Sequence, residues 1–184
     1  LLTRGRVMVG KALRIDTDAR EVVLATGERL PYDVVVIATG ADYPEPARFY
    51  GTTAEEALKS FADQQHKIAS AEHVLVVGGG PSGVELSAEI CLARPDARVT
   101  LAHSGTELLH NTGVERAGRR ARTWLEDHGV DVRLDSFMSP GNDFGTYPDT
   151  RGNTIAADLS FWAIGPTPKT TCLGLGEHAH LLTG

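Results

Sequence analysis

Three closely spaced glycines, Gly78, Gly80 and Gly83, form the pattern in this sequence that points most directly to chemistry. They follow an apolar run, residues 73–77, and precede apolar residues at helical spacing. In such a strand–turn–helix the first glycine allows a sharp turn, the second leaves main-chain N–H groups bare, and the third lets the helix pack closely on the strand. The helix start adds free N–H donors and partial positive charge. The pattern therefore predicts a site for the diphosphate of a dinucleotide; the alternative is a tight turn that binds nothing.

The predicted site includes the other residues of the turn and the start of the helix. Gly79, Pro81 and Ser82 complete the turn. Glu85 falls in the first helical turn, where the helix dipole favours a carboxylate. In that interpretation Glu85 only stabilises the helix. The alternative is that its carboxylate contacts the nicotinamide-ribose end of the cofactor.

The end of the next expected strand, residues 98–102, bears on which nucleotide binds. A carboxylate there would bind the ribose hydroxyls of an NAD-type cofactor. His103 and Ser104 stand at this point instead, so the acidic selector is missing. We predict that both contact the cofactor, with a surface role for His103 as the alternative. The sequence favours neither NADH nor NADPH.

Other reactive residue types lack partners at a useful spacing. Cys91 and Cys172 form no C-x-x-C pair and are interpreted as packing residues, which predicts a reducing, cytoplasmic location. His178 and His180 lack companion ligands, so no metal site is predicted. We nominate no nucleophile and no general base. The arginines of one expected helix are interpreted as a solvated face: Arg116, Arg119, Arg120 and Arg122.

Composition narrows the class of protein. The 184 residues include 18 basic and 24 acidic side chains, a net charge of −6, which argues against nucleic acid as the main partner. A hydrophobic fraction of 41% is ordinary for a folded domain. No apolar run approaches the roughly 20 residues of a membrane-spanning helix. The chain starts with Leu1 rather than Met, so we expect either that a front part was removed or that this is an excised piece.

Two segments repeat at a fixed offset of 125 residues. The matching residues are Gly27 and Gly152, Asp33 and Asp158, Ala38 and Ala163, and Gly40 and Gly165. Each copy predicts a turn followed by an apolar strand, the first over residues 34–38. A continuous apolar strand is typical of a parallel sheet covered on both faces, so the repeat indicates two related modules.

The remaining elements follow from periodicity and turn residues. We expect strands at 6–10 and 12–16, a hairpin over 21–30, an amphipathic helix over 53–69, and a strand at 130–134. A helix with Val84, Ala88 and Cys91 at helical spacing should follow the glycine turn and end near Pro95. A further helix should bury Val114, Ala117, Ala121, Trp124 and Leu125 and be capped by Gly129. The order from residue 73 onward predicts a doubly wound α/β module.

Taken in order, these motifs resemble those of a known superfamily. The residues that carry the resemblance are Ala38-Thr39-Gly40, the glycine turn with Val84-Glu85, Val99-Thr100-Leu101, and Trp162-Ala163-Ile164-Gly165. The chain resembles the pyridine nucleotide-disulfide oxidoreductases, and within them the apoptosis-inducing-factor-like and ferroptosis-suppressor-like branch. The resemblance implies an α/β, Rossmann-like FAD/NAD(P)-binding fold with an added hairpin, truncated at both ends.

The resemblance also implies a domain plan and cofactors. Residues 1–71 and 166–184 would belong to an FAD-binding domain, and residues 72–165 to an inserted NAD(P)H-binding domain. Thr39 and Gly40 would lie beside FAD, and Gly165 would join the glycine turn at NAD(P)H. The family's first glycine fingerprint, its later Gly-Asp motif and its C-terminal domain are not in this sequence. Where many relatives have Pro-Asn, this chain has Thr167-Pro168-Lys169.

The activity implied is hydride transfer from NAD(P)H to FAD and onward to a small-molecule acceptor such as a quinone. The chain by itself is expected to be inactive. Membrane attachment would come only from parts not present, and the oligomeric state stays open. A non-catalytic nucleotide-binding or interaction module is the alternative. A short-chain dehydrogenase is disfavoured by the repeat and by the lack of a Tyr-x-x-x-Lys pair.

Overall fold

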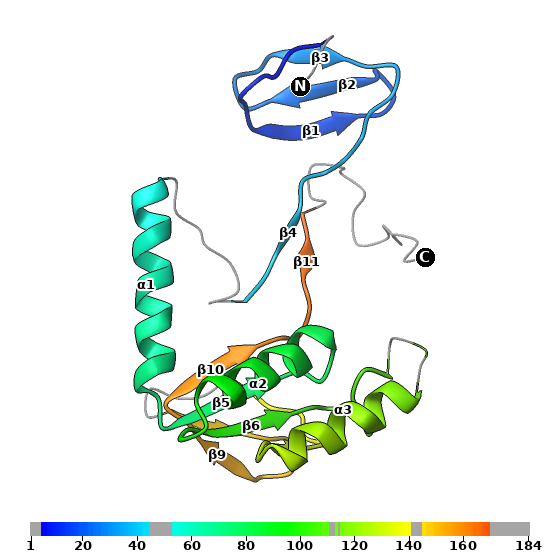
Figure 1. Ribbon diagram of the computed structural model, residues 1–184. Coiled ribbons are helices and arrows are strands. Elements are labelled where there is room, and N and C mark those ends of the chain that lie inside the picture. The colour runs from blue at the N-terminus through cyan, green and yellow to red at the C-terminus, as the bar shows by residue number, and fades with distance from the viewer. Residues whose placement is uncertain (1–4, 45–52, 111–112, 114, 141–144, 170–184) are drawn as a thin grey trace. The chain divides into compact units, whose positions relative to one another are not determined.

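The computed structural model describes residues 5–44, 53–110, 113, 115–140 and 145–169 (Figure 1). The chain divides into two compact units. The first unit is Leu1–Asp42 with Thr167–Gly184, and the second unit is Tyr43–Pro166.

The first unit contains an antiparallel sheet of three short strands, in the order β1-β2-β3. The strands are Ala12–Asp16, Glu21–Leu24 and Arg29–Pro31. The predicted hairpin over 21–30 is therefore confirmed. Gly27 adopts a φ of 85° in its turn, a conformation that glycine reaches without strain. A second pair of strands, β4 (Ala41–Asp42) and β11 (Thr167–Pro168), is antiparallel.

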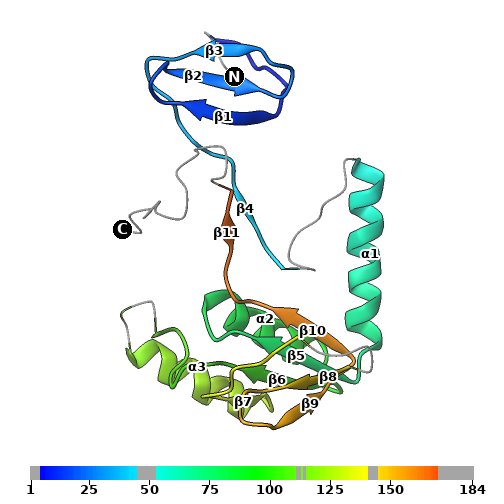
Figure 2. The ribbon, with the colours of Figure 1, turned by 180° about the vertical axis from the view of Figure 1, so that it is seen from behind.

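The second unit is built on a four-stranded parallel sheet in the order β10-β5-β6-β7. The strands are β5 (His73–Val77), β6 (Arg98–Ala102), β7 (Asp131–Arg133) and β10 (Leu159–Trp162). Helices α2 (Pro81–Ala93) and α3 (Glu115–Asp127) cover one face. A hairpin of β8 (Thr146–Pro148) and β9 (Thr154–Ala156) covers the other, as Figure 2 shows from behind. The predicted α/β, Rossmann-like module with a parallel sheet is confirmed, with a β-hairpin in place of helices on the second face.

The position of β5 inside the sheet, covered on both faces, explains why its sequence is apolar throughout. Val74 and Val76 belong to the core beneath α2 and α3, whereas Leu75 and Val77 belong to the core beneath the β8–β9 hairpin. Alternate side chains of a strand point to opposite faces, so a strand covered on both sides has no polar face. Each fully buried side chain of this size contributes about 1.5–3 kcal/mol to folding. The glycine turn thus follows a strand that is buried on both faces.

The predicted helix over 53–69 is observed as α1 (Ala54–Ser70). It starts at Thr53 with a capping box, in which the Thr53 side chain accepts from the Glu56 N–H and the Glu56 side chain accepts from the Thr53 N–H. Such a cap contributes about 1 kcal/mol. Its apolar residues Leu58 and Phe61 are exposed, at 70% and 61%.

Two predicted strands are wrong. Residues 34–38 form no strand, and Val34 and Val36 are more than 80% exposed. Their counterpart β10 pairs with β5, whereas the described part of the first unit offers residues 34–38 no neighbouring strand. Residues 6–10 likewise lack strand pairing, and Val9 is fully exposed. An apolar run forms a strand only where a partner supplies its hydrogen bonds.

The α3 region follows the prediction with one correction. Leu125 is buried and Gly129 ends the helix with a φ of 83°. Trp124 is not on the inner stripe, because its side chain is exposed and stacks on His128 with ring centroids 3.8 Å apart. One of the predicted solvated arginines, Arg122, forms an ion pair with Glu126 at 2.8 Å. Val114 lies outside the described residues.

The cysteine and histidine predictions are partly testable. Cys91 is buried and its thiol donates to the Ala88 carbonyl, as expected of a packing residue. Cys172, His178 and His180 lie outside the described residues. Within the described ranges, no three metal-ligating side chains come together. None of the helices in those ranges has the length and apolar character needed to cross a bilayer.

Candidate functional site

The glycine turn joins β5 to α2 by main-chain packing that leaves no space for two side chains. Gly78 has a φ of 119°, and a Cβ built on it would lie 2.3 Å from the Ala163 carbonyl oxygen. A Cβ on Gly83 would lie 1.9 Å from the Gly78 carbonyl oxygen. Both distances are far below van der Waals contact, so the fold itself requires glycine at these positions.

Gly80 is a glycine that the fold does not require. Its φ of −75° and ψ of −179° are open to any residue, and a Cβ there would meet nothing within 4 Å. It is the N-cap of α2, whose first turn begins with Pro81 and has no side-chain cap. The bare N–H groups at this helix start therefore face space, which fits a phosphate held against the main chain.

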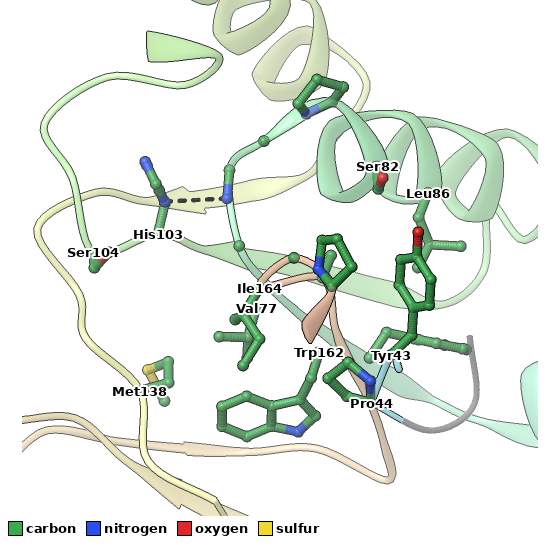
Figure 3. Close-up of a pocket in the computed structure, with 18 of the residues that line it drawn as sticks. Tyr43, Pro44, Val77, Ser82, Leu86, His103, Ser104, Met138, Trp162 and Ile164 are labelled. Atoms are coloured by element: carbon green, nitrogen blue, oxygen red, sulfur yellow. Dashed lines mark hydrogen bonds between the residues drawn. The ribbon is translucent and has the colours of Figure 1, made fainter. Parts of the chain in front are cut away.

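A cavity of about 710 Å³ opens in front of the turn (Figure 3). It lies at the carboxyl ends of the parallel strands, where ligands bind in open α/β sheets. Gly78, Gly79 and Gly80 form one part of its wall. Among the described residues that line it, none is Asp, Glu, Lys or Arg. A bound anion would therefore be held by main-chain dipoles rather than by side-chain charges.

The rest of the wall is largely apolar and was missed by the sequence reasoning. Met138 comes from the segment after β7, and Trp162 and Ile164 from the end of β10 and beyond. Trp162 donates its indole N–H to the Ser160 hydroxyl at 3.3 Å. Apolar side chains suit the faces of aromatic rings, and the indole of Trp162 is itself flat. The signal that could have found them is their position after the strand ends.

His103 lies beside the turn. Its Nδ1 accepts a hydrogen bond from the Gly79 N–H at 3.1 Å, shown as a dashed line in Figure 3. Its own main-chain N–H donates to the Arg133 carbonyl, which fixes the loop after β6 on β7. Burial lowers the pKa of His103, and the nearby His110 lowers it further. The neutral ring is therefore favoured at the turn.

The structure brings most of the predicted site residues to one cavity. Those that line it are Gly78, Gly79, Gly80, Pro81, Ser82, His103, Ser104 and Gly165. Gly83 is buried behind the turn. Glu85 is exposed and is not among the lining residues. Thr39 and Gly40 belong to the first unit, where the Thr39 hydroxyl donates to the Lys169 carbonyl and the Gly40 carbonyl accepts from the Lys169 N–H.

Comparison with known proteins agrees with this geometry. Residues 3–184 match the family model of pyridine nucleotide-disulphide oxidoreductases. The chain therefore belongs to that family. It is 36% identical over 159 residues to the FAD-dependent oxidoreductase FVFD30 of Flammulina velutipes, covering 83% of this chain and 48% of that protein. It is 28% identical over 165 residues to human ferroptosis suppressor protein 1, covering 85% and 44%.

Solved structures of a ferredoxin reductase and an NADH oxidase share the fold of this chain. A ferredoxin reductase from Rhodopseudomonas palustris superposes with a TM-score of 0.68 at 21% identity, covering 90% of this chain and 42% of that one. A water-forming NADH oxidase from Lactobacillus brevis, solved with bound NADH, has a TM-score of 0.64 at 21% identity, covering 89% and 38%. The chain thus spans about half the length of the proteins it matches, or less.

Proposed function

We propose that this chain supplies the NAD(P)H-binding part of a flavin-dependent oxidoreductase. The observation that carries the proposal is Gly80, whose bare main chain faces a cavity at a helix start although nothing in the fold requires glycine there. Family membership and the FAD-dependent relative support the reaction class. The NADH-bound oxidase of like fold supports the choice of nucleotide.

Each part of the cavity has its own role in this proposal. The main-chain N–H groups of Gly80 and Ser82 hold the diphosphate, helped by the dipole of α2, whereas Pro81 between them has no N–H to donate. Trp162 and Met138 provide apolar surface for the ring systems of the dinucleotide. When bound, NAD(P)H supplies a hydride that FAD accepts. The protein's part is to place and orient, so hydride transfer itself asks for no side-chain acid or base.

The larger assignments rest on the family resemblance. We propose that residues 72–165 are the NAD(P)H domain, and that residues 1–71 and 166–184 belong to the FAD domain with Thr39 and Gly40 beside the flavin. The similarity to ferroptosis suppressor protein 1 leads us to propose a small-molecule acceptor of the quinone type. The cysteine spacing supports a reducing compartment such as the cytoplasm.

Energy transfer from tryptophan to bound NADH tests nucleotide binding at this cavity. Trp162 lines the cavity and Trp124 lies on α3; these are the two tryptophans of the chain. Excitation of the chain should produce NADH emission that saturates with NADH. Trp124→Phe should keep this signal, whereas Trp162→Phe should lose most of it while calorimetry still detects binding. No saturable binding of NADH or NADPH up to millimolar concentration would refute the proposal.

A second measurement separates an enzyme from a non-catalytic nucleotide-binding module. The protein from the full gene should show flavin absorbance and should oxidise NADH or NADPH when a short-chain quinone is added. Nucleotide binding by a colourless protein that oxidises neither coenzyme would instead support the module. Oxidation that stops when the quinone is omitted would support the proposed acceptor class.

A further inference from the structure

The loop that follows β6 holds the main chain of Gly79 at two points, its N–H and its carbonyl. Its N–H donates to His103 Nδ1 at 3.1 Å, and its carbonyl accepts from the Leu109 N–H at 2.8 Å. A Cβ on Gly79 would lie 2.6 Å from His103 Cγ and 2.7 Å from Leu108 Cδ2. The imidazole thus packs directly on the main chain that adjoins Gly80.

The hydrogen bond to Gly79 determines the protonation of the imidazole. Because a main-chain N–H can only donate, Nδ1 must accept, and the ring proton of the neutral form sits on Nε2. Nε2 is buried and makes no hydrogen bond of standard geometry to the described residues, although the Glu107 main chain lies close enough to favour the protonated ring. Nε2 lies 2.9 Å from where a Cβ of Gly105 would be, so main chain closes over it. A second proton on the ring would set two N–H groups against each other at Nδ1.

We propose that His103 is a positioning residue, whose neutral imidazole holds the Gly79 peptide so that the turn presents its bare N–H groups to the nucleotide diphosphate. The inference rests on the proposed function. Protonation of His103 breaks the hydrogen bond to Gly79 and leaves a buried charge in place of an acceptor. Nucleotide affinity is then full while the ring is neutral and falls as the pH drops through the pKa of His103.

The titratable groups around His103 favour its neutral form, as the proposed loss of affinity in acid requires. The titratable residues of its own loop are Glu107 and His110; of these, His110 lowers the pKa of His103 by charge, and the Glu107 main chain raises it. The segment from β7 adds Arg133, which is paired with Asp131 at 2.9 Å, and Asp135, which is exposed. The glycine turn adds no titratable side chain. Burial is the largest influence and lowers the pKa below 6.5.

Binding of NADH to the full chain between pH 5 and 8 tests the proposal. The Kd of the wild-type chain should be constant at the upper end and should rise by up to about tenfold per pH unit below the pKa of His103. In His103→Asn the amide oxygen replaces Nδ1 as acceptor, so affinity should stay within about twofold of wild type at pH 8 and no longer depend on pH. His103→Leu should bind about fivefold more weakly at every pH.

His110→Gln is the matched control. It removes the other nearby histidine, keeps His103, and should retain the pH dependence with its midpoint moved to higher pH. A wild-type Kd that stays constant over the pH range in which the His103 ring takes up its second proton would overturn the proposal. So would a Kd that falls in acid, or a gain in acid for NADPH alone, because both mean that the imidazolium pairs with ligand phosphate.

Nitrogen NMR of the unliganded chain gives a readout independent of binding. The His103 ring should show an unprotonated Nδ1 and a protonated Nε2 at pH 8, and the Gly79 amide signal should titrate together with the ring. A protonated Nδ1 at pH 8 would overturn the proposal directly. Absence of NADH binding at every pH would refute the proposed function, and the inference would fall with it whatever the tautomer.

Discussion

Replacing Gly80 by valine tests whether this glycine is required for ligand binding or for folding. The position has extended backbone and open space around its missing Cβ, so the chain should fold, at a cost of up to about 1 kcal/mol because valine is a poorer N-cap than glycine. The branched side chain would stand where the diphosphate approaches the main chain. Losing one hydrogen bond to a charged group costs about 1.5–3 kcal/mol, which weakens binding roughly 10- to 150-fold.

Calorimetric NADH titration and thermal unfolding of the same samples provide the measurement. Gly83→Ala is the matched contrast, since its Cβ would lie 1.9 Å from a carbonyl oxygen. It should destabilise the chain by about 1–3 kcal/mol and lower the melting temperature by roughly 2–4 °C for each kcal/mol. If Gly80→Val binds NADH as wild type does, or unfolds as early as Gly83→Ala, the reasoning about the turn is refuted.

Two further predictions concern polar contacts that hold the second unit together. Asp158 Oδ2 accepts from the Glu72 and His73 N–H groups at 2.9 and 2.8 Å, so Asp158→Ala should cost about 1–2 kcal/mol in urea unfolding. Asp158→Asn keeps an acceptor oxygen and should cost less; equal losses would contradict the assignment. The Asn153 side-chain amide, followed by main-chain N–H groups, lowers the pKa of Asp149 below 3.8, so its contribution is present above pH 3.8 and lost as pH falls through the lowered value. The urea midpoints of wild type and Asp149→Asn should converge below pH 3.8, and a gap that persists to the lowest pH would disprove this.

The sequence predicts the second unit well because its signals are local. The apolar run of β5, the glycine turn and the spacing along α2 each depend on neighbours within a few residues, and the structure confirms all three elements. The segment 34–38 shows where such signals fail. It has the same local pattern as β10, but a strand also needs a partner, and that requirement cannot be seen within the segment itself.

The candidate site was predictable in its main chain but not in its side chains. The turn follows from the glycine spacing together with the apolar strand before it and the helical spacing after it. The contact of His103 with Gly79 joins residues 24 positions apart and depends on how the loop after β6 folds back. The sequence therefore placed His103 near the ribose, whereas the structure directs its Nδ1 to the turn. Met138 and Trp162 enter the wall only because β7 and β10 end at the same edge of the sheet.

Under the proposed function, the uncharged wall of the cavity would affect the release of the oxidised coenzyme. Oxidation turns the nicotinamide from a neutral ring into a cation. The described residues of the wall include no carboxylate, so this new charge meets no counter-ion there. Water solvates a cation better than an apolar wall does. The walls therefore favour departure of the oxidised form, and a fresh reduced molecule can take its place.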